Sequence, residues 1–280
     1  MDIRYSCSPR DIVHYSTEDL RREFLITNLY APDKVNAVYS HVDRMVTLGA
    51  MPVSKKLAID DGLDVWANFG THYFLERREI GIFNLGGSGK IDADDSTYSL
   101  GSKDCLYITK GTQKVFFSSD NPDTPAKFYM VSAPAHTSYE TRLIRIADAA
   151  KRPLGDTATS NKRVINQFIH PAVLKTCQLS MGLTELDSGS VWNTMPAHTH
   201  ERRMEVYTYF EIPEGNIVFH FMGQGQETRH IVMNNFDAVI SPSWSIHAGA
   251  GTANYSFIWA MGGENQEFDD MDVIPTENLR

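Results

Sequence analysis

An internal repeat is the feature that most constrains the fold of this chain. Shifting the N-terminal half of the 280-residue sequence by 126 positions brings several identical residues together, including a tryptophan, a histidine and a glutamate. The matched pairs are Val65 with Val191, Trp66 with Trp192, His72 with His198, Arg77 with Arg203 and Glu79 with Glu205. After a seven-residue insertion in the second half, Asp104 matches Asp237 and Lys114 matches His247. Self-similarity at one offset indicates two copies of one structural unit.

Each copy is predicted to consist of short β-strands. Runs rich in β-branched and aromatic residues alternate with turn residues, and only residues 16–25 show a helical pattern, with Ser16 or Thr17 as N-cap. Residues 86–89 are glycine-rich but lack the Lys-Ser/Thr of a phosphate-binding loop, so we expect a hairpin turn. The predicted strands are 26–30, 37–41, 45–48, 53–59, 80–85, 105–109, 114–118, 127–132, 163–169, 177–186, 191–192, 204–210, 217–222, 230–233, 238–240 and 256–261. This pattern predicts an all-β protein with a few short helices, built as two antiparallel β-barrels or jelly rolls.

The boundary between the two copies is expected near residue 150. Residues 148–161 are rich in Pro, Gly, Thr, Ser and Ala, which is typical of a linker. We therefore predict an N-terminal domain over 1–150, with an N-terminal arm, and a C-terminal domain over 151–280. The acidic, polar tail 264–280 is expected to pack across a surface.

The second copy contains a set of metal-ligand residues. His198 and His200 are two apart, so on a β-strand both imidazoles point to the same side. Glu205 follows on a run that favours a strand, and His247 lies downstream. Three imidazoles and one carboxylate suit a divalent ion such as zinc, iron or manganese better than calcium, which requires more oxygen ligands.

The first copy lacks two of these ligands. Phe74 occupies the position of the second histidine and Lys114 that of the third, so only His72 and Glu79 remain. Two ligands are fewer than a catalytic zinc site normally uses, and an ammonium repels a cation. We therefore expect one metal per chain, a first copy that is catalytically inactive, and an ion pair between Lys114 and Glu79 in place of the metal.

Composition excludes several functional classes. The net charge of −9 argues against a nucleic-acid partner or an anionic membrane surface. Cys7, Cys105 and Cys177 are an odd, scattered set, which favours the reducing cytoplasm over a disulfide framework. We expect no secretory leader at the N-terminus and no membrane-spanning segment, because apolar runs of the required length are missing.

The ligand pattern resembles a known superfamily. His-x-His-x4-Glu followed by Pro-x-Trp-x-x-His is similar to the two motifs of cupins, although Trp244 stands where many cupins have Gly. A more specific resemblance, nearly end to end, is to the 5-dehydro-4-deoxy-D-glucuronate isomerase family, also called 4-deoxy-L-threo-5-hexosulose-uronate ketol-isomerase. It is carried by FLERRE (74–79), TPAKFY (124–129), CQLSMGLTEL (177–186), WNTMP (192–196), QETRHIVM (226–233) and FDDMD (268–272).

The resemblance implies a fold, a cofactor and a reaction. It implies a bicupin that binds one Zn²⁺ through His198, His200, Glu205 and His247, and that assembles as a homohexamer. The implied enzyme acts in the breakdown of pectin and related uronates. It moves the carbonyl of 5-dehydro-4-deoxy-D-glucuronate from C1 to C2, giving 3-deoxy-D-glycero-2,5-hexodiulosonate, by metal-assisted proton transfer between these carbons.

The residues that contact the substrate are less clearly marked. Arginine binds carboxylates well, and aromatic residues line sugar pockets, which makes Arg163, Arg203, Tyr207, Arg229 and Trp244 the candidates for substrate binding. The sequence does not identify the catalytic base. Glu205, Glu227 and His230 are candidates, with His220 as another nearby titratable group.

Two other functional classes stay open at this point. A cupin with three histidines and one glutamate can be an iron-dependent dioxygenase, which bound-metal analysis would distinguish. A bicupin can also be a non-enzymatic sugar-binding protein. The intact ligand set of the second copy argues against that alternative.

Overall fold

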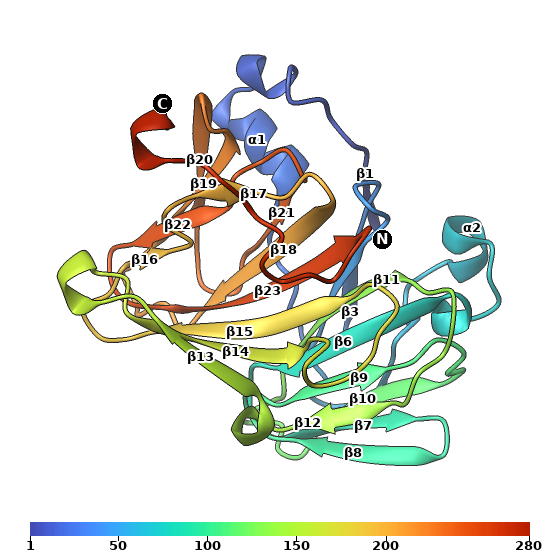
Figure 1. Cartoon of the computed structure of the whole chain (residues 1–280). Coiled ribbons are helices and arrows are strands. Elements are labelled where there is room, and N and C mark those ends of the chain that lie inside the picture. Colours follow the sequence, from blue (N-terminus) through green and yellow to red (C-terminus); the bar gives the residue numbers. More distant parts are fainter. The chain divides into compact units, whose positions relative to one another are not determined.

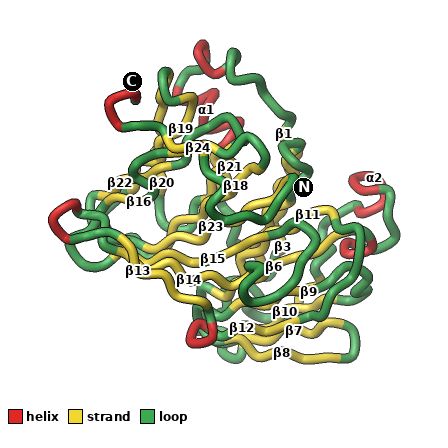
Figure 2. Tube along the Cα trace, in the orientation of Figure 1, coloured by secondary structure: helices red, strands yellow, loops and turns green.

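The computed structural model describes all 280 residues, and most of its ordered elements are strands (Figures 1 and 2). The only α-helices are α1 (Thr17–Phe24) and α2 (Val65–Phe69). Helix α1 confirms the predicted helix, because Ser16 accepts a hydrogen bond from the Asp19 N–H while the Asp19 carboxylate accepts one from the Ser16 N–H. No helix is long and apolar enough to cross a membrane.

The chain divides into two compact units, and neither is continuous in sequence. The N-terminal unit comprises Met1–Arg4, Asn28–Ala150 and Phe168–Ser180, and the C-terminal unit comprises Tyr5–Thr27, Lys151–Gln167 and Met181–Arg280. The predicted division into 1–150 and 151–280 therefore misplaces two segments. Tyr5–Thr27 belongs to the C-terminal unit, and Phe168–Ser180 belongs to the N-terminal unit. Part of the expected linker is also ordered, as β13 (Ala150–Leu154) and a 3-10 turn over Thr157–Thr159.

The N-terminal unit contains two sheets. The larger has the order β1 (Asp2–Arg4), β3 (Val35–Ser40), β4 (Val46–Ala50), β11 (Phe128–Pro134), β6 (Arg78–Asn84), β9 (Cys105–Ile108) and β12 (Arg142–Ile144). The smaller has the order β5 (Leu57–Ala58), β10 (Val115–Ser119), β7 (Gly89–Ala93) and β8 (Ser96–Leu100). Both sheets contribute apolar residues to one core, including Leu48 and Ile82 from the first and Ile91 and Phe117 from the second.

The C-terminal unit repeats this arrangement. Its larger sheet has the order β13, β14 (Arg163–Ile169), β15 (Ser180–Leu186), β23 (Ser256–Gly263), β18 (Arg203–Phe210), β21 (Ala238–Ser241) and β2 (Leu25–Ile26). Its smaller sheet has the order β16 (Trp192–Asn193), β22 (Ala248–Gly251), β19 (Val218–Gln224) and β20 (Glu227–Met233). A further pair joins β17 (His198–Thr199) to β24 (Asp272–Val273). Two such all-β units confirm the predicted fold class.

Residues matched by the sequence repeat occupy corresponding positions in the strands but not in the segments between the strands. Strand β6 lies between β11 and β9, as β18 lies between β23 and β21, and Glu79 and Glu205 occupy corresponding strands. Trp66 and Trp192 are not equivalent, because Trp66 lies on α2 with 65% of its surface exposed, whereas Trp192 belongs to β16. Predicted strands 26–30 and 53–59 are shorter than expected, since only β2 and β5 form there.

Glu79 does not pair with Lys114, so that prediction is wrong. The Lys114 side chain is exposed, whereas Glu79 is completely buried. Its carboxylate accepts hydrogen bonds from the Tyr107 hydroxyl and from the backbone N–H groups of Cys177, Gln178 and Leu179, all between 2.8 and 2.9 Å. Four donors satisfy this buried carboxylate without a cation. The donors from 177–179 also explain why the segment 168–180 belongs to the N-terminal unit.

His72 is likewise not directed at Glu79. Its side chain is exposed and its ring stacks on Trp66, with 5.5 Å between ring centroids. The two ligand-type residues that remain in the first copy therefore do not converge, which is consistent with a first copy that binds no metal.

Replacing Glu79 by Ala should loosen the 168–180 segment. The substitution leaves three backbone N–H groups and a phenol without their acceptor, at about 1–3 kcal/mol for each buried group. We expect amide hydrogen exchange over 168–180 to accelerate strongly, as measured by mass spectrometry. Glu140→Ala, which removes an exposed carboxylate from the same unit, is the matched control and should leave the rates unchanged. Unchanged protection in Glu79→Ala would contradict the role given to this carboxylate.

Candidate metal centre

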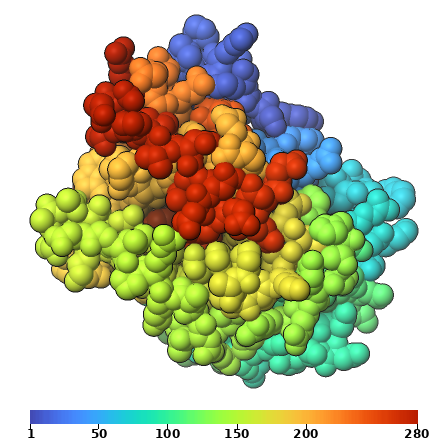
Figure 3. Space-filling model, in the orientation of Figure 1, coloured from blue at the N-terminus to red at the C-terminus, as the bar shows by residue number.

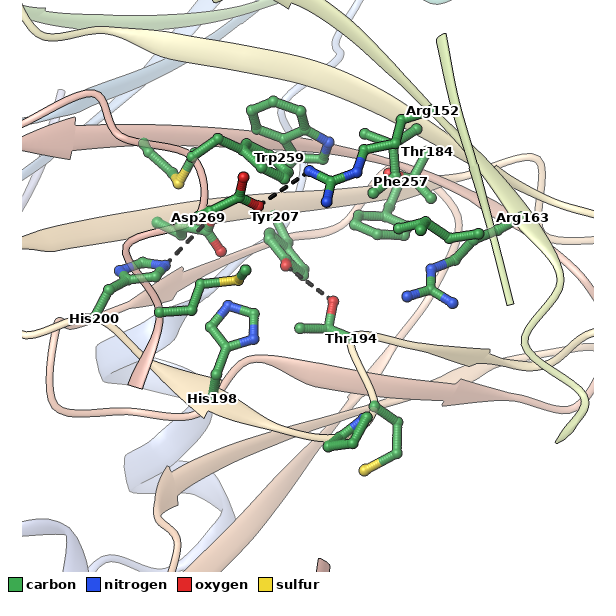
Figure 4. A pocket seen from close by; sticks show the side chains of 18 of the residues that line it. Arg152, Arg163, Thr184, Thr194, His198, His200, Tyr207, Phe257, Trp259 and Asp269 are labelled. Atoms are coloured by element: carbon green, nitrogen blue, oxygen red, sulfur yellow. Dashed lines mark hydrogen bonds and ion pairs between the residues drawn. The ribbon is translucent and has the colours of Figure 1, made fainter. Parts of the chain in front are cut away.

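Three histidines of the C-terminal unit converge at one point, and two of them, His198 and His200, are labelled in Figure 4. His198 lies on β17, His200 follows that strand, and His247 immediately precedes β22. One ring nitrogen from each lies within 4.8 Å of the other two, and the Nε2 atoms of His198 and His247 are 3.0 Å apart. The predicted grouping of these histidines is therefore confirmed, although His200 lies beyond the end of a two-residue strand rather than on it (Figure 4).

Glu205 completes the cluster from the neighbouring sheet. It lies on β18, where it pairs with Ser241 of β21 and Met261 of β23, and only 4% of its surface is exposed. Its Oε2 is 3.1 Å from His247 Nε2, and its Oε1 is 3.8 Å from His200 Nε2. The four residues named from the sequence thus meet in one place.

Backbone carbonyl groups orient two of the imidazoles. His200 Nδ1 lies 2.9 Å from the Arg203 carbonyl oxygen, and His247 Nδ1 lies 3.3 Å from that of Ser245. A carbonyl oxygen only accepts, so each Nδ1 carries the proton and donates it. The Nε2 atoms then direct their lone pairs toward the centre of the cluster, which is the arrangement of metal-ligating histidines.

The cluster contains polar atoms that the protein itself leaves unsatisfied. His200 Nε2 and Glu205 Oε2 are buried and have no hydrogen-bond partner. His247 Nε2 lies 3.1 Å from Glu205 Oε2, but with its proton on Nδ1 this imidazole has no hydrogen at Nε2 to donate, so Oε2 keeps no hydrogen-bond partner. Buried polar atoms without partners are costly, and a cation between them would remove the cost. The three histidines can therefore hold a metal ion.

Burial sets the protonation of these groups. It lowers the pKa of His198 to about 3, and it also lowers the pKa values of His200 and His247. It raises the pKa of Glu205 to about 8. The imidazoles are therefore neutral at pH 7, as metal binding requires, and a cation beside Glu205 favours the carboxylate form.

A cavity of about 230 Å³ opens beside the cluster, entirely within the C-terminal unit. Its walls are mostly apolar and aromatic, with a few polar groups. The lining residues besides His198, His200 and Glu205 include Phe257, Trp259, Phe268, Met261, Met271, Thr184, Thr194, Tyr207, Arg152, Arg163 and Asp269 (Figure 4). Apolar walls with few convergent polar groups are typical of small-molecule sites.

Two of the predicted substrate contacts line this cavity. Tyr207 keeps strand phase with Glu205, and its hydroxyl lies 3.2 Å from Thr194 Oγ1. Arg163 donates to the Asn161 carbonyl oxygen, and burial lowers the pKa of its guanidinium. In Figure 4, Arg163 and His200 lie on opposite sides of the residues drawn.

The other predicted contacts lie elsewhere. Arg203 is buried and donates to the Asp270 carbonyl oxygen, because at the start of β18 its side chain meets the C-terminal tail. Arg229 pairs with Glu227 at 2.7 Å and donates to the Val13 carbonyl oxygen. Trp244 packs edge-on against Phe24. None of these three residues lines the cavity.

The candidate bases beyond Glu205 are also outside the cavity. Glu227 forms a salt bridge with Arg229, and His230 is exposed and packs against Phe219. His220 is completely buried between the two sheets, where its Nδ1 lies 2.8 Å from the Tyr209 hydroxyl. These residues are close to the ligand motif in sequence, but they do not lie at the cavity in the structure.

The C-terminal tail is part of the site, and sequence reasoning missed this contribution. Strand β24 pairs with β17 so that Val273 lies opposite His198, and the Ile274 N–H donates to the Ala197 carbonyl oxygen. The tail, coloured red, lies across the face of the molecule turned to the viewer in Figure 3. The only signal in the sequence was the string FDDMD, which contains the cavity residues Phe268, Asp269 and Met271.

Comparison with known proteins agrees with these features. The model of the KduI/IolB family matches residues 30–275. A protein of Enterobacter sp. (strain 638) named 4-deoxy-L-threo-5-hexosulose-uronate ketol-isomerase is 53% identical over 280 residues, covering 100% of both chains. A protein of the same name from Yersinia pestis (strain Pestoides F) is 54% identical over the same length and coverage.

Solved structures share the fold at low identity. An IolB-like protein from Salmonella typhimurium LT2 has a TM-score of 0.72 at 15% identity, covering 91% of this chain and 97% of that one. An oxalate decarboxylase from Lactobacillus farciminis has a TM-score of 0.56 at 10% identity, covering 83% of this chain and 82% of that one. At these identities the likeness shows the fold alone.

Proposed function

The chain belongs to the KduI/IolB family, and from this premise we propose that it is a ketol-isomerase of uronate breakdown. The observation that carries the proposal is the end-to-end identity of 53–54% with proteins named 4-deoxy-L-threo-5-hexosulose-uronate ketol-isomerase. The reaction converts 5-dehydro-4-deoxy-D-glucuronate to 3-deoxy-D-glycero-2,5-hexodiulosonate. The carbonyl moves from C1 to C2 with no net oxidation, so no redox cofactor is required.

His198, His200, Glu205 and His247 are the proposed ligands of one Zn²⁺. Support comes from their convergence and from the unsatisfied atoms His200 Nε2 and Glu205 Oε2. When bound, zinc supplies Lewis acidity that stabilises negative charge on a substrate oxygen without inviting electron transfer. The neutral imidazoles and the buried glutamate are suited to holding a divalent ion at pH 7.

The cavity walls contain a cation, hydroxyl groups and aromatic rings that suit the binding of an open-chain uronate. Arg163 is the proposed partner of the substrate carboxylate, since its guanidinium lines the cavity across from the histidine cluster (Figure 4). The hydroxyls of Tyr207 and Thr194 are available to the hydroxyl groups of the substrate. The rings of Phe257, Trp259 and Phe268 keep water away from the reacting carbons.

Assembly and location follow from the same resemblance. We propose a homohexamer in the cytoplasm. The three cysteines, Cys7, Cys105 and Cys177, are free thiols, which suits a reducing compartment.

The proposed activity is tested by an isomerase assay on the purified protein and on His200→Ala. This substitution removes one proposed ligand, and we expect the wild type to form product and kcat/KM of the variant to fall by at least about 100-fold. Circular dichroism should show that the variant stays folded. A wild type that does not convert this substrate would contradict the proposed function. A fully active, metal-free His200→Ala protein would contradict the role of the cluster.

One metal per chain is the expected stoichiometry. Elemental analysis of protein purified without added metal should give about one equivalent of zinc per chain, because only the second copy has enough converging ligands. His198→Ala should lose this equivalent, whereas His72→Ala, the matched change in the first copy, should keep it. A value near two, with one equivalent lost in His72→Ala, would show that the first copy binds metal.

A further inference from the structure

One carboxylate lines the cavity without belonging to the histidine cluster. Apart from Glu205, the titratable side chains in the cavity wall are Arg152, Arg163, Tyr207, Asp269, His198 and His200. Asp269 is the only acidic side chain among those outside the cluster. It lies in the C-terminal tail, and its side chain is 71% exposed, so a substrate entering the cavity can reach it.

Contacts on both sides hold Asp269 at this position. Arg152 Nη1 donates to Asp269 Oδ1 at 3.0 Å (Figure 4). The preceding residue, Phe268, packs its ring against Trp259 at 5.3 Å and lies under the Arg152 guanidinium at 5.7 Å. The following residue, Asp270, accepts hydrogen bonds from Arg202 and Asn265. A tail held on both sides of Asp269 keeps its carboxylate at the cavity.

The isomerisation requires a group that carries a proton between neighbouring carbons. Such a group must reach the substrate and must be able to accept a proton at neutral pH. The arginines are always protonated, and the Tyr207 hydroxyl is hydrogen-bonded to Thr194 Oγ1. His198, His200 and Glu205 are proposed metal ligands, so their lone pairs are used in the cluster. Asp269 meets both requirements, because a carboxylate is a proton acceptor and this one lines the cavity, where Arg152 holds it through Oδ1.

We propose, on the basis of the isomerase function proposed above, that Asp269 is the proton-transfer residue and that Arg152 is its positioning residue. The Asp269 carboxylate takes the proton from C2 of the substrate, and the electron pair of the C2–H bond forms a C1=C2 double bond. The electron pair of the C1 carbonyl moves to its oxygen, which gains a proton from water. The C2 hydroxyl then gives its proton to water, and its O–H electron pair forms the new C2 carbonyl. The C1=C2 pair takes a proton from the Asp269 carboxyl to form the new C1–H bond, and this proton exchanges with solvent at the exposed carboxyl before it is transferred. Atoms and electrons balance without an oxidant or reductant.

The test compares Asp269→Asn with Glu267→Gln. Both substitutions remove one negative charge from the tail and preserve side-chain size, but Glu267 is exposed and does not line the cavity. We expect kcat of Asp269→Asn to fall by about 10²–10⁴-fold, with KM changed only a few-fold and zinc content unchanged. Glu267→Gln should retain wild-type kinetics. Arg152→Gln should show a smaller loss of kcat than Asp269→Asn, because it displaces the carboxylate without removing it.

Two further measurements separate proton transfer from a structural role. In heavy water the wild type should place solvent deuterium at C1 of the product, and this incorporation should slow in parallel with turnover in Asp269→Asn. Added formate should restore part of the activity of Asp269→Ala, since a small carboxylate can enter the space left by the side chain, and should not affect Glu267→Gln.

Each outcome has a distinct meaning. An active wild type with an Asp269→Asn variant of equal kcat would overturn the assignment of Asp269 and leave the proposed function intact. Loss of activity with loss of zinc, and without formate rescue, would also overturn it, since the residue would then only support the cluster. A wild type that neither isomerises the uronate nor exchanges its hydrogens would instead contradict the proposed function itself.

Discussion

A buried carboxylate on the central strands of each unit is the constraint on which both halves of the structure depend. Taking an ionised carboxylate out of water is costly unless donors or a cation compensate it. In the N-terminal unit the compensation for Glu79 is complete, from Tyr107 and the backbone of 177–179. In the C-terminal unit Glu205 faces imidazoles and keeps an unsatisfied oxygen. One position in a repeated fold thus supports a structural contact in one copy and a cluster able to hold a metal ion in the other.

The C-terminal tail connects the metal centre to the substrate cavity. Strand β24 pairs with β17, which carries His198, and the residues just before β24 form part of the cavity wall. Arg202 also holds the tail, pairing with Asp270 and Asp272. A change that frees the tail is therefore expected to displace one proposed ligand, His198, and one side of the cavity together.

The sequence was sufficient for features set by local spacing and insufficient for those set by distant contacts. The inward direction of Tyr207 follows from its strand phase with Glu205. The predicted convergence of His198 and His200 is observed, although His200 lies one residue beyond the strand whose alternation was the basis of the prediction. The Arg152–Asp269 pair joins residues 117 positions apart, and no periodicity in the sequence reports such a pair. Lys114 was assigned inward from its match with His247, yet it is exposed, because matching positions do not guarantee matching side-chain directions.

Dependence of turnover on the bound ion is the most direct test of the central claim that the histidine cluster is a catalytic metal centre. The measurement is the rate of ketol isomerisation before chelation, after chelation and after re-addition of one equivalent of Zn²⁺ per chain, with circular dichroism recorded at each stage. Activity should be lost on chelation while the fold is retained, and it should return when zinc is added. Full activity in the chelated, metal-free protein would contradict the central claim.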